Sequence, residues 1–209
     1  MRIDPKSMAL GLLKTATPVM FFTGSPGVGK TAMAAACAQA LAEAGRRVLL
    51  VVGNDPGSAF GVPVDPQATV VPPSRGLQAV RSGGPEAIAA QLAQGCGDID
   101  HCIFDVDLTA LIQSWRTQPE ALPSLHRHDG LLALADPWQT TVVLVTRPDA
   151  ATLRATARLH EDLAALDVGR QWLLVNGWPQ AASALPAALQ ALPRDVVAPP
   201  ADSPTPASP

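Results

Sequence analysis

Residues 21–33 read FFTGSPGVGKTAM, and the segments on either side of this stretch decide the fold of the chain. Residues 19–23, VMFFT, form a short apolar run that stops at Gly24, as a buried strand does. Residues 31–44 contain strong helix formers and no helix breaker, and the glycine and two arginines that follow are typical of a helix carboxyl end. The sequence therefore predicts a strand, a glycine-rich loop and a helix in immediate succession.

The loop Gly24–Thr31 fits the pattern G-x-x-x-x-G-K-S/T, the Walker A phosphate-binding loop. Its glycines let backbone N–H groups converge on phosphate oxygens at a helix amino end, while Lys30 reaches the β- and γ-phosphates and the Thr31 hydroxyl ligates Mg²⁺. We therefore expect ATP and Mg²⁺ as ligands; the alternative is a glycine-rich turn with a solvated lysine. The nucleotide-binding residues expected here are Gly24, Ser25, Pro26, Gly27, Val28, Gly29, Lys30, Thr31 and Ala32.

Further apolar runs alternate with helical patterns along the rest of the chain. Strands are predicted over 48–52, 101–107, 140–146 and 171–176, and helices over 85–94 and 149–165. Strands that are apolar along their whole length imply a parallel sheet covered on both faces. The predicted fold class is α/β, a doubly wound and mostly parallel sheet flanked by helices, as in P-loop NTPases.

The predicted domain organisation is a single nucleotide-binding domain over residues 1–192. Residues 193–209 are rich in proline and have little to bury, so we expect a disordered tail. No pattern assigns residues 112–130.

Composition excludes several classes of partner. The formal net charge is −3, which does not favour non-specific binding to nucleic acid or anionic lipid. No apolar run reaches the roughly 18–20 residues that cross a bilayer, and the beginning of the sequence does not resemble a secretion signal. Three cysteines are too few for a disulfide scaffold. We therefore expect a cytoplasmic location.

Residues 21–61, FFTGSPGVGKTAMAAACAQALAEAGRRVLLVVGNDPGSAFG, resemble the arsenite-pump ATPase (ArsA) family and its relatives that target tail-anchored membrane proteins. Later segments agree in order. HCIFD at 101–105 resembles the Walker B strand of the family, and residues 133–166 and QWLLVNG at 171–177 resemble its C-terminal half. MinD and ParA proteins share the expected fold but match these later segments less well.

The resemblance implies a role for individual residues. It assigns phosphate and magnesium binding to Gly27, Gly29, Lys30 and Thr31. Asp55 matches the switch aspartate that positions the attacking water, so Lys30 and Asp55 are the expected catalytic residues. The expected metal-binding residues are Thr31, Asp55 and Asp105. Asp105 matches the Walker B aspartate that supports Mg²⁺, and Asn176 matches the asparagine that reads the adenine edge. The alternatives are a plain turn for Asp55, a strand-end residue for Asp105 and a turn residue for Asn176.

The chain also departs from the family pattern. The family has a second lysine near the start of its Walker loop, where this chain has Ser25. A cation aimed at the transferring phosphoryl group is worth about 10³–10⁵ in rate, so its loss predicts slow turnover. The family switch after the Walker B aspartate is replaced by VDLTALIQSW at 106–115, in which Asp107 either assists the metal or is an ordinary loop carboxylate. The chain is also considerably shorter than a family member, and the missing length falls between residues 81 and 135.

Other candidate sites are weaker. A metalloid site needs three convergent thiolates, whereas the three cysteines, Cys37, Cys96 and Cys102, are more simply small buried residues. His126 and His128 favour a polar loop over a metal site, because no third ligand is in view. Arginines 147, 154 and 158 form either a basic binding face or, more simply, a solvated helix face.

The leading hypothesis is a Mg·ATP-dependent ATPase whose nucleotide cycle controls assembly with itself, as a homodimer, or with a protein partner. The alternative is a degenerate nucleotide-binding module with negligible hydrolysis. A positioning ATPase like MinD or ParA ranks lowest, because the sequence shows neither a membrane-targeting amphipathic end nor a strong basic patch.

Overall fold

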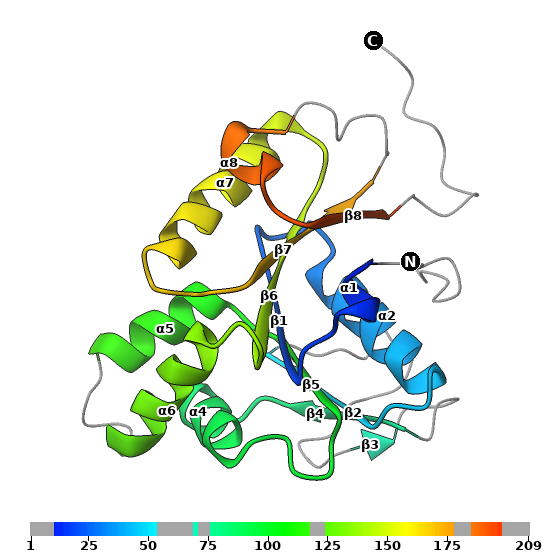
Figure 1. Cartoon of the computed structure of the whole chain (residues 1–209), viewed down its shortest axis with the longest axis vertical. Coiled ribbons are helices and arrows are strands. Elements are labelled where there is room, and N and C mark those ends of the chain that lie inside the picture. The colour runs from blue at the N-terminus through cyan, green and yellow to red at the C-terminus, as the bar shows by residue number, and fades with distance from the viewer. Residues whose placement is uncertain (1–10, 54–68, 71–75, 118–123, 178–184, 198–209) are drawn as a thin grey trace.

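The computed structural model describes residues 11–53, 69–70, 76–117, 124–177 and 185–197, which form one sheet with helices on both faces (Figure 1). The strands are β1 (Val19–Thr23), β2 (Val48–Val52), β3 (Thr69–Val70), β4 (Leu77–Arg81), β5 (His101–Asp105), β6 (Thr140–Thr146), β7 (Gln171–Asn176) and β8 (Arg194–Val197). The helices are α1 (Gly11–Lys14), α2 (Lys30–Glu43), α4 (Pro85–Gln94), α5 (Leu108–Thr117), α6 (Ser124–Ala135), α7 (Ala150–Ala164) and α8 (Ala187–Gln190).

The sheet has the order β3-β4-β2-β5-β1-β6-β7-β8. Only β3 runs antiparallel to its neighbour, so the other seven strands are parallel. The chain leaves β1, passes β5 to reach β2, and later returns across β1 from β5 to β6. The α/β, doubly wound fold predicted from the sequence is therefore confirmed.

The two faces of the sheet carry separate apolar cores. On β1, Met20 and Phe22 belong to the core that α1 and α2 cover, whereas Val19 and Phe21 belong to the core under α4, α5, α6, α7 and α8. The same division is visible in Figure 1, where α1 and α2 lie on one side of the strands. Because both faces of β1 are covered, every one of its side chains is buried, which explains its continuous apolar sequence.

Helix α2 packs unusually small residues against the sheet. Eight of its 14 residues are buried, and five of these eight are alanines. Small side chains let the helix lie close to the strands, and the helix ends where Gly45 takes a φ of 84°, a left-handed conformation that favours glycine. This packing fixes the amino end of α2 directly after β1.

Most predicted elements are confirmed, several of them to the residue. The strand predicted over 101–107 ends at Asp105 instead. In the region 112–130, which had no assignment, residues 112–117 belong to α5 and residues 124–130 to α6. Strands β3 and β4 were not expected. No helix in the described part of the chain is long and apolar enough to cross a membrane.

The prediction of a disordered tail over 193–209 is wrong for its first residues. Residues Arg194–Val197 form β8, which pairs in parallel with β7. The Asp195 carboxylate accepts hydrogen bonds from the backbone N–H groups of Gly11 and Leu12 and from the Trp172 indole, at 2.8, 2.9 and 3.0 Å. These contacts connect β8 to α1 and β7, and residues 198–209 lie outside the described residues.

Candidate nucleotide-binding site

The glycine-rich loop lies at the carboxyl edge of the sheet, between β1 and α2. Strand β1 is flanked by β5 and β6, and Phe22 is in register with Asp105 at the end of β5. Carboxyl ends of parallel strands, at the point where the chain winds to either side, are where open α/β sheets bind ligands. The loop therefore occupies the position in this fold where a ligand is expected.

Position 24 requires a glycine because the neighbouring strand β6 passes close to its backbone. Its φ is 145°, and a side-chain Cβ at this position would lie 2.2 Å from the Val145 carbonyl oxygen of β6. Gly27 and Gly29 also have positive φ values, 78° and 94°. The glycines of the pattern are thus explained by backbone shape as well as by the ligand that they are expected to hold.

The amino end of α2 is open, unlike those of the two helices that follow the neighbouring strands. Asp107 accepts a hydrogen bond from the Ala110 N–H at the start of α5, and Asp149 accepts one from the Thr152 N–H at the start of α7. At α2 the cap residue is Gly29, and no side chain of the described chain caps the helix. Its first N–H groups and the positive end of its dipole are therefore available to an anion.

The Lys30 ammonium folds back over this loop. Its Nζ donates a hydrogen bond to the Ser25 carbonyl oxygen at 2.9 Å. A flexible lysine held by one neutral carbonyl can exchange that partner for a phosphate oxygen, which carries charge and binds a cation more strongly. The loop thus brings a positive charge and an open helix end to the same place.

Thr31 and Asp105 meet beside the loop. The Thr31 hydroxyl donates to Asp105 Oδ2 at 2.5 Å, and the Asp105 residue is only 7% exposed. Burial raises the pKa of the Asp105 carboxyl, while the Thr31 hydrogen bond and the Lys30 charge act in the opposite direction. A buried carboxylate with a hydroxyl beside it is costly to ionise unless a cation is added.

These two oxygen donors fit a magnesium ion in kind. Mg²⁺ prefers oxygen ligands and is typically held by one or two protein groups together with substrate phosphates and water. No group of three or more histidine, cysteine, aspartate or glutamate side chains among the described residues could hold a metal by itself. The donor set is therefore consistent with a metal that arrives with a nucleotide.

Asn176, at the end of β7, braces the loop from the other side. Its Nδ2 donates to the Val28 carbonyl oxygen at 2.8 Å, and a Cβ on Gly29 would lie 2.5 Å from the same nitrogen. The structure thus brings Asn176 to the loop; its role toward adenine stays a prediction. Asp55, predicted to position water, lies outside the described residues.

The structure gives Asp107 a structural role as the cap of α5. The helix begins at Leu108, three residues after Asp105, so the stretch 106–115, which replaces the family switch, is largely helical. Sequence reasoning missed this cap, although Asp107 precedes Leu108, Leu111, Ile112 and Trp115, whose spacing is that of a buried helix face.

The weaker candidates do not assemble into sites. Cys37 belongs to the core on the α2 face and Cys102 to the core on the opposite face, so the three thiols do not converge. The side chains of His126 and His128 lie outside those that the structure describes. Arginines 147, 154 and 158 are exposed.

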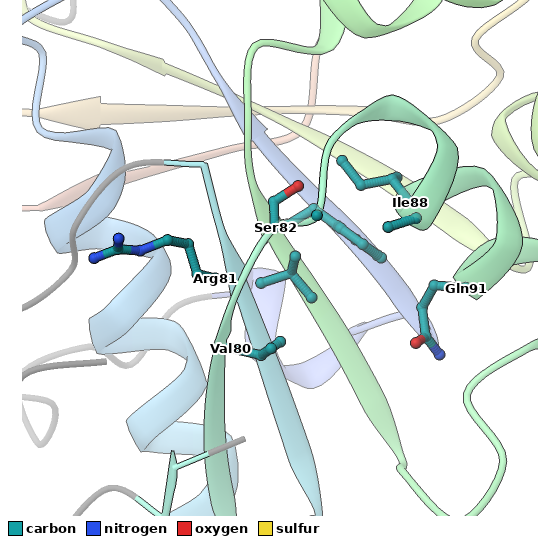
Figure 2. A pocket seen from close by; sticks show the side chains of 9 residues that line it. Val80, Arg81, Ser82, Ile88 and Gln91 are labelled. Atoms are coloured by element: carbon teal, nitrogen blue, oxygen red, sulfur yellow. The ribbon is translucent and has the colours of Figure 1, made fainter. Parts of the chain in front are cut away.

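A cavity of about 130 Å³ lies between the sheet and α4 (Figure 2). Val51, Val80 and Phe104 line it from three neighbouring strands, and Ile88 and Gln91 line it from the helix. In Figure 2 the Arg81 guanidinium points away from Ile88 and Gln91. Among the described residues, none of the predicted site residues borders this cavity, which lies on the sheet face opposite to α2.

Comparisons with known proteins agree with this geometry. The family model described as anion-transporting ATPase (ArsA_ATPase) matches residues 17–62. The chain is 31% identical to the arsenical pump-driving ATPase of Acidiphilium multivorum, across 79% of this chain and 40% of that protein. It is also 31% and 30% identical to two arsenical pump-driving ATPases of Escherichia coli, across 79% and 76% of this chain.

The chain thus spans about 40% of the length of these curated relatives. The first alignment is 237 residues long yet takes in only 79% of 209 residues, so the relative carries additional residues within the matched region. The match covers the loop that places Lys30 and continues far beyond it. The chain therefore belongs to the ArsA-type ATPase family.

Proposed function

We propose that the chain binds Mg·ATP at the loop Gly24–Thr31 and hydrolyses it slowly. The single observation that carries the proposal is the open amino end of α2 beside Lys30, in contrast to the aspartate-capped ends of α5 and α7. The contact of Thr31 with Asp105 adds oxygen donors suited to Mg²⁺. The family supports ATPase activity at the level of its named members.

In this proposal each residue acts on the phosphates or on water. Lys30 leaves the Ser25 carbonyl and neutralises charge that develops on the γ-phosphate, while loop N–H groups hold the β-phosphate. Asp55, by its family match, orients the attacking water. Bound Mg²⁺ supplies further neutralisation of phosphate charge, and Thr31 and Asp105 are the residues that hold it.

Slow turnover is expected from Ser25. It takes the place of the second lysine of the family pattern, and its contribution in the present structure is a backbone carbonyl that binds Lys30. With one cation fewer on the transferring group, the rate falls by about 10³–10⁵ relative to an enzyme that has it. The nucleotide cycle then serves to control assembly with a second copy or with a protein partner.

A second candidate function is nucleotide binding with negligible hydrolysis. The observation that favours it is the start of α5 immediately after Asp107, because a capped helix replaces the segment expected to follow the γ-phosphate. A protein of this kind would bind ATP as a structural or regulatory ligand.

Phosphate release by the purified protein, compared with Lys30→Ala, tests both candidates. Turnover that disappears in the variant supports the ATPase, and ATP binding without turnover that is lost in the variant supports the binding module. Lys14→Ala is the matched control, because Lys14 is an exposed lysine at the end of α1. If calorimetry with Mg²⁺ detects no ATP binding by the wild type at millimolar concentration, the proposal is wrong.

A further inference from the structure

Two of the cysteines lie against each other at the edge of the sheet away from the glycine-rich loop. Cys96 follows α4, and Cys102 is the second residue of β5. Both donate to the Pro18 carbonyl oxygen, Cys96 through Sγ at 3.5 Å and Cys102 through its backbone N–H at 2.7 Å. Each of the two side chains is also the largest influence on the pKa of the other thiol. The shared acceptor and this mutual influence place the two thiols close to each other.

The two thiols differ in access. Cys102 is 1% exposed, whereas Cys96 is partly exposed to solvent. Cys37 is fully buried in the core on the other face of the sheet, and burial raises the pKa of its thiol to about 12. The pair is thus distinct from the third cysteine in both contact and accessibility.

The backbone around Cys96 can adjust to bring the sulfurs to bonding distance. A disulfide needs an S–S separation of about 2.05 Å, which is shorter than a thiol–thiol hydrogen bond. Cys96 lies between Gly95 and Gly97, whose φ values are 70° and 52°, and a Cβ on either glycine would have no described atom within 4 Å. Glycine on both sides and open space around them make the required shift of Cys96 inexpensive.

We propose that Cys96 and Cys102 form a redox-active dithiol, which a small disulfide such as oxidised glutathione converts to an intramolecular disulfide. The Cys96 thiolate attacks one sulfur of the small disulfide, forming a mixed disulfide and releasing one thiol. Cys102 then loses its proton and attacks the Cys96 sulfur, which releases the second thiol. One disulfide is reduced to two thiols and the protein dithiol loses two hydrogens, so the exchange balances. The proposal is independent of nucleotide binding.

The electrostatics of the pair assign the order of attack. The neighbouring Cys102 side chain lowers the pKa of the Cys96 thiol, and the Cys96 side chain together with burial raises the pKa of the Cys102 thiol. The more acidic thiol is also the exposed one, so Cys96 is the thiol that an external disulfide meets as a thiolate. Cys102 needs no access to solvent, because its target is the adjacent Cys96 sulfur.

The test treats the reduced protein, residues 1–209, anaerobically with oxidised glutathione and maps its cysteines by mass spectrometry after non-reducing digestion. We expect two of the three thiols to be lost, a linked peptide pair containing Cys96 and Cys102, and Cys37 still reduced. Two outcomes would overturn the proposal: glutathione that remains on Cys96 without a Cys96–Cys102 disulfide, or Cys96 and Cys102 that both stay reduced. This measurement on the wild type does not depend on any variant folding.

Three variants assign the order of the steps. Cys102→Ser is expected to accumulate glutathione on Cys96, because the resolving thiol is absent. Cys96→Ser is expected to leave Cys102 reduced, since the buried thiol cannot meet the oxidant. Cys37→Ser is the matched control and is expected to form the internal disulfide like the wild type. Disulfide formation through Cys37 in any variant would contradict the assignment.

Discussion

Asp105 is expected to lower the stability of the ligand-free protein and to support Mg²⁺ binding in the proposed function. Its carboxylate is buried beside the Thr31 hydroxyl, and burial is the main reason why its pKa is raised. Neither partner supplies a full compensating charge, because Thr31 is neutral and Lys30 Nζ is bonded to the Ser25 carbonyl. A residue that is costly to keep ionised without ligand is well suited to a site where a divalent cation enters.

The Asp105→Asn variant tests this opposition. Because the folded-state pKa of Asp105 lies above its unfolded value, the stability that the protonated form contributes is present at low pH and is lost as the pH rises through the folded-state pKa. Without ligand at neutral pH, we therefore expect the variant to be more stable by about 1 kcal/mol, or a few degrees in melting temperature. The difference should close below about pH 4.

Thermal unfolding across this pH range measures the effect, and ATP titration with Mg²⁺ supplies the functional comparison. Removing a carboxylate that supports a metal is expected to weaken Mg²⁺-dependent ATP binding by about 10- to 100-fold. A variant that is less stable than the wild type at neutral pH without ligand would show that Asp105 is stabilised by its surroundings.

At the scale of elements, the sequence was most informative where burial was complete. Strand β6 was predicted at its observed bounds because all seven of its residues are apolar or threonine and all are buried. Strand β4 was missed because only Leu77 and Ala79 of its five residues are buried, which leaves no continuous apolar run like that of β1. Helix α5 was not predicted, although the apolar residues from Leu108 to Trp115 have the spacing of a buried helix face. Residues 112–130 were treated as one segment without a pattern, and this division cut through the helix.

The site shows the same division between what sequence can and cannot give. The loop pattern predicted Lys30 and Thr31 at the amino end of α2, and the family resemblance predicted that Asp105 and Asn176 approach them. Thr31 meets Asp105 through their side chains, but two other contacts of the loop, Lys30 with the Ser25 carbonyl and Asn176 with the Val28 carbonyl, involve main-chain oxygens. Every residue has a main-chain carbonyl oxygen, so the pattern of side chains in the sequence could not predict which carbonyl accepts each of these hydrogen bonds.

Gly29→Ala tests how β7 supports the loop before α2. The new Cβ would lie 2.5 Å from Asn176 Nδ2 and would displace that side chain from the Val28 carbonyl. We expect a loss of stability of about 1–3 kcal/mol, from the left-handed backbone and the broken hydrogen bond, and a loss of ATP affinity of at least roughly tenfold.

Gly45→Ala is the matched control, measured by urea unfolding and ATP titration in parallel. Gly45 has a similar φ, 84° against 94°, but a Cβ at this position would have no described atom within 4 Å. It should therefore show the backbone cost of about 1–2 kcal/mol and unchanged ATP affinity. Equal ATP affinities for the two variants would contradict a role for the Asn176 brace.

At the scale of the whole molecule, the ends of the described chain meet at one side of the sheet. Strand β8 is the last strand beyond β7, and α1 packs beside it on the face that α2 also covers. Composition favoured a disordered tail here, because a segment rich in proline with few apolar residues has little to bury. What composition could not reveal is that Asp195 pairs with backbone groups 184 and 183 residues away.

Asp195→Ala tests whether this contact joins the two ends energetically. The substitution removes one charged acceptor from the Gly11 and Leu12 N–H groups and from the Trp172 indole. Hydrogen bonds to charged groups contribute about 1.5–3 kcal/mol, and the three donors share one carboxylate, so we expect a loss of about 2–3 kcal/mol in urea unfolding. Hydrogen exchange should accelerate together in α1 and β8, which are adjacent only in the folded chain.

Asp162→Ala, at an exposed position on α7, should leave both measurements unchanged. Faster exchange in α1 with β8 unaffected would mean that β8 is held by its pairing with β7 alone and that Asp195 serves only to cap the first helix.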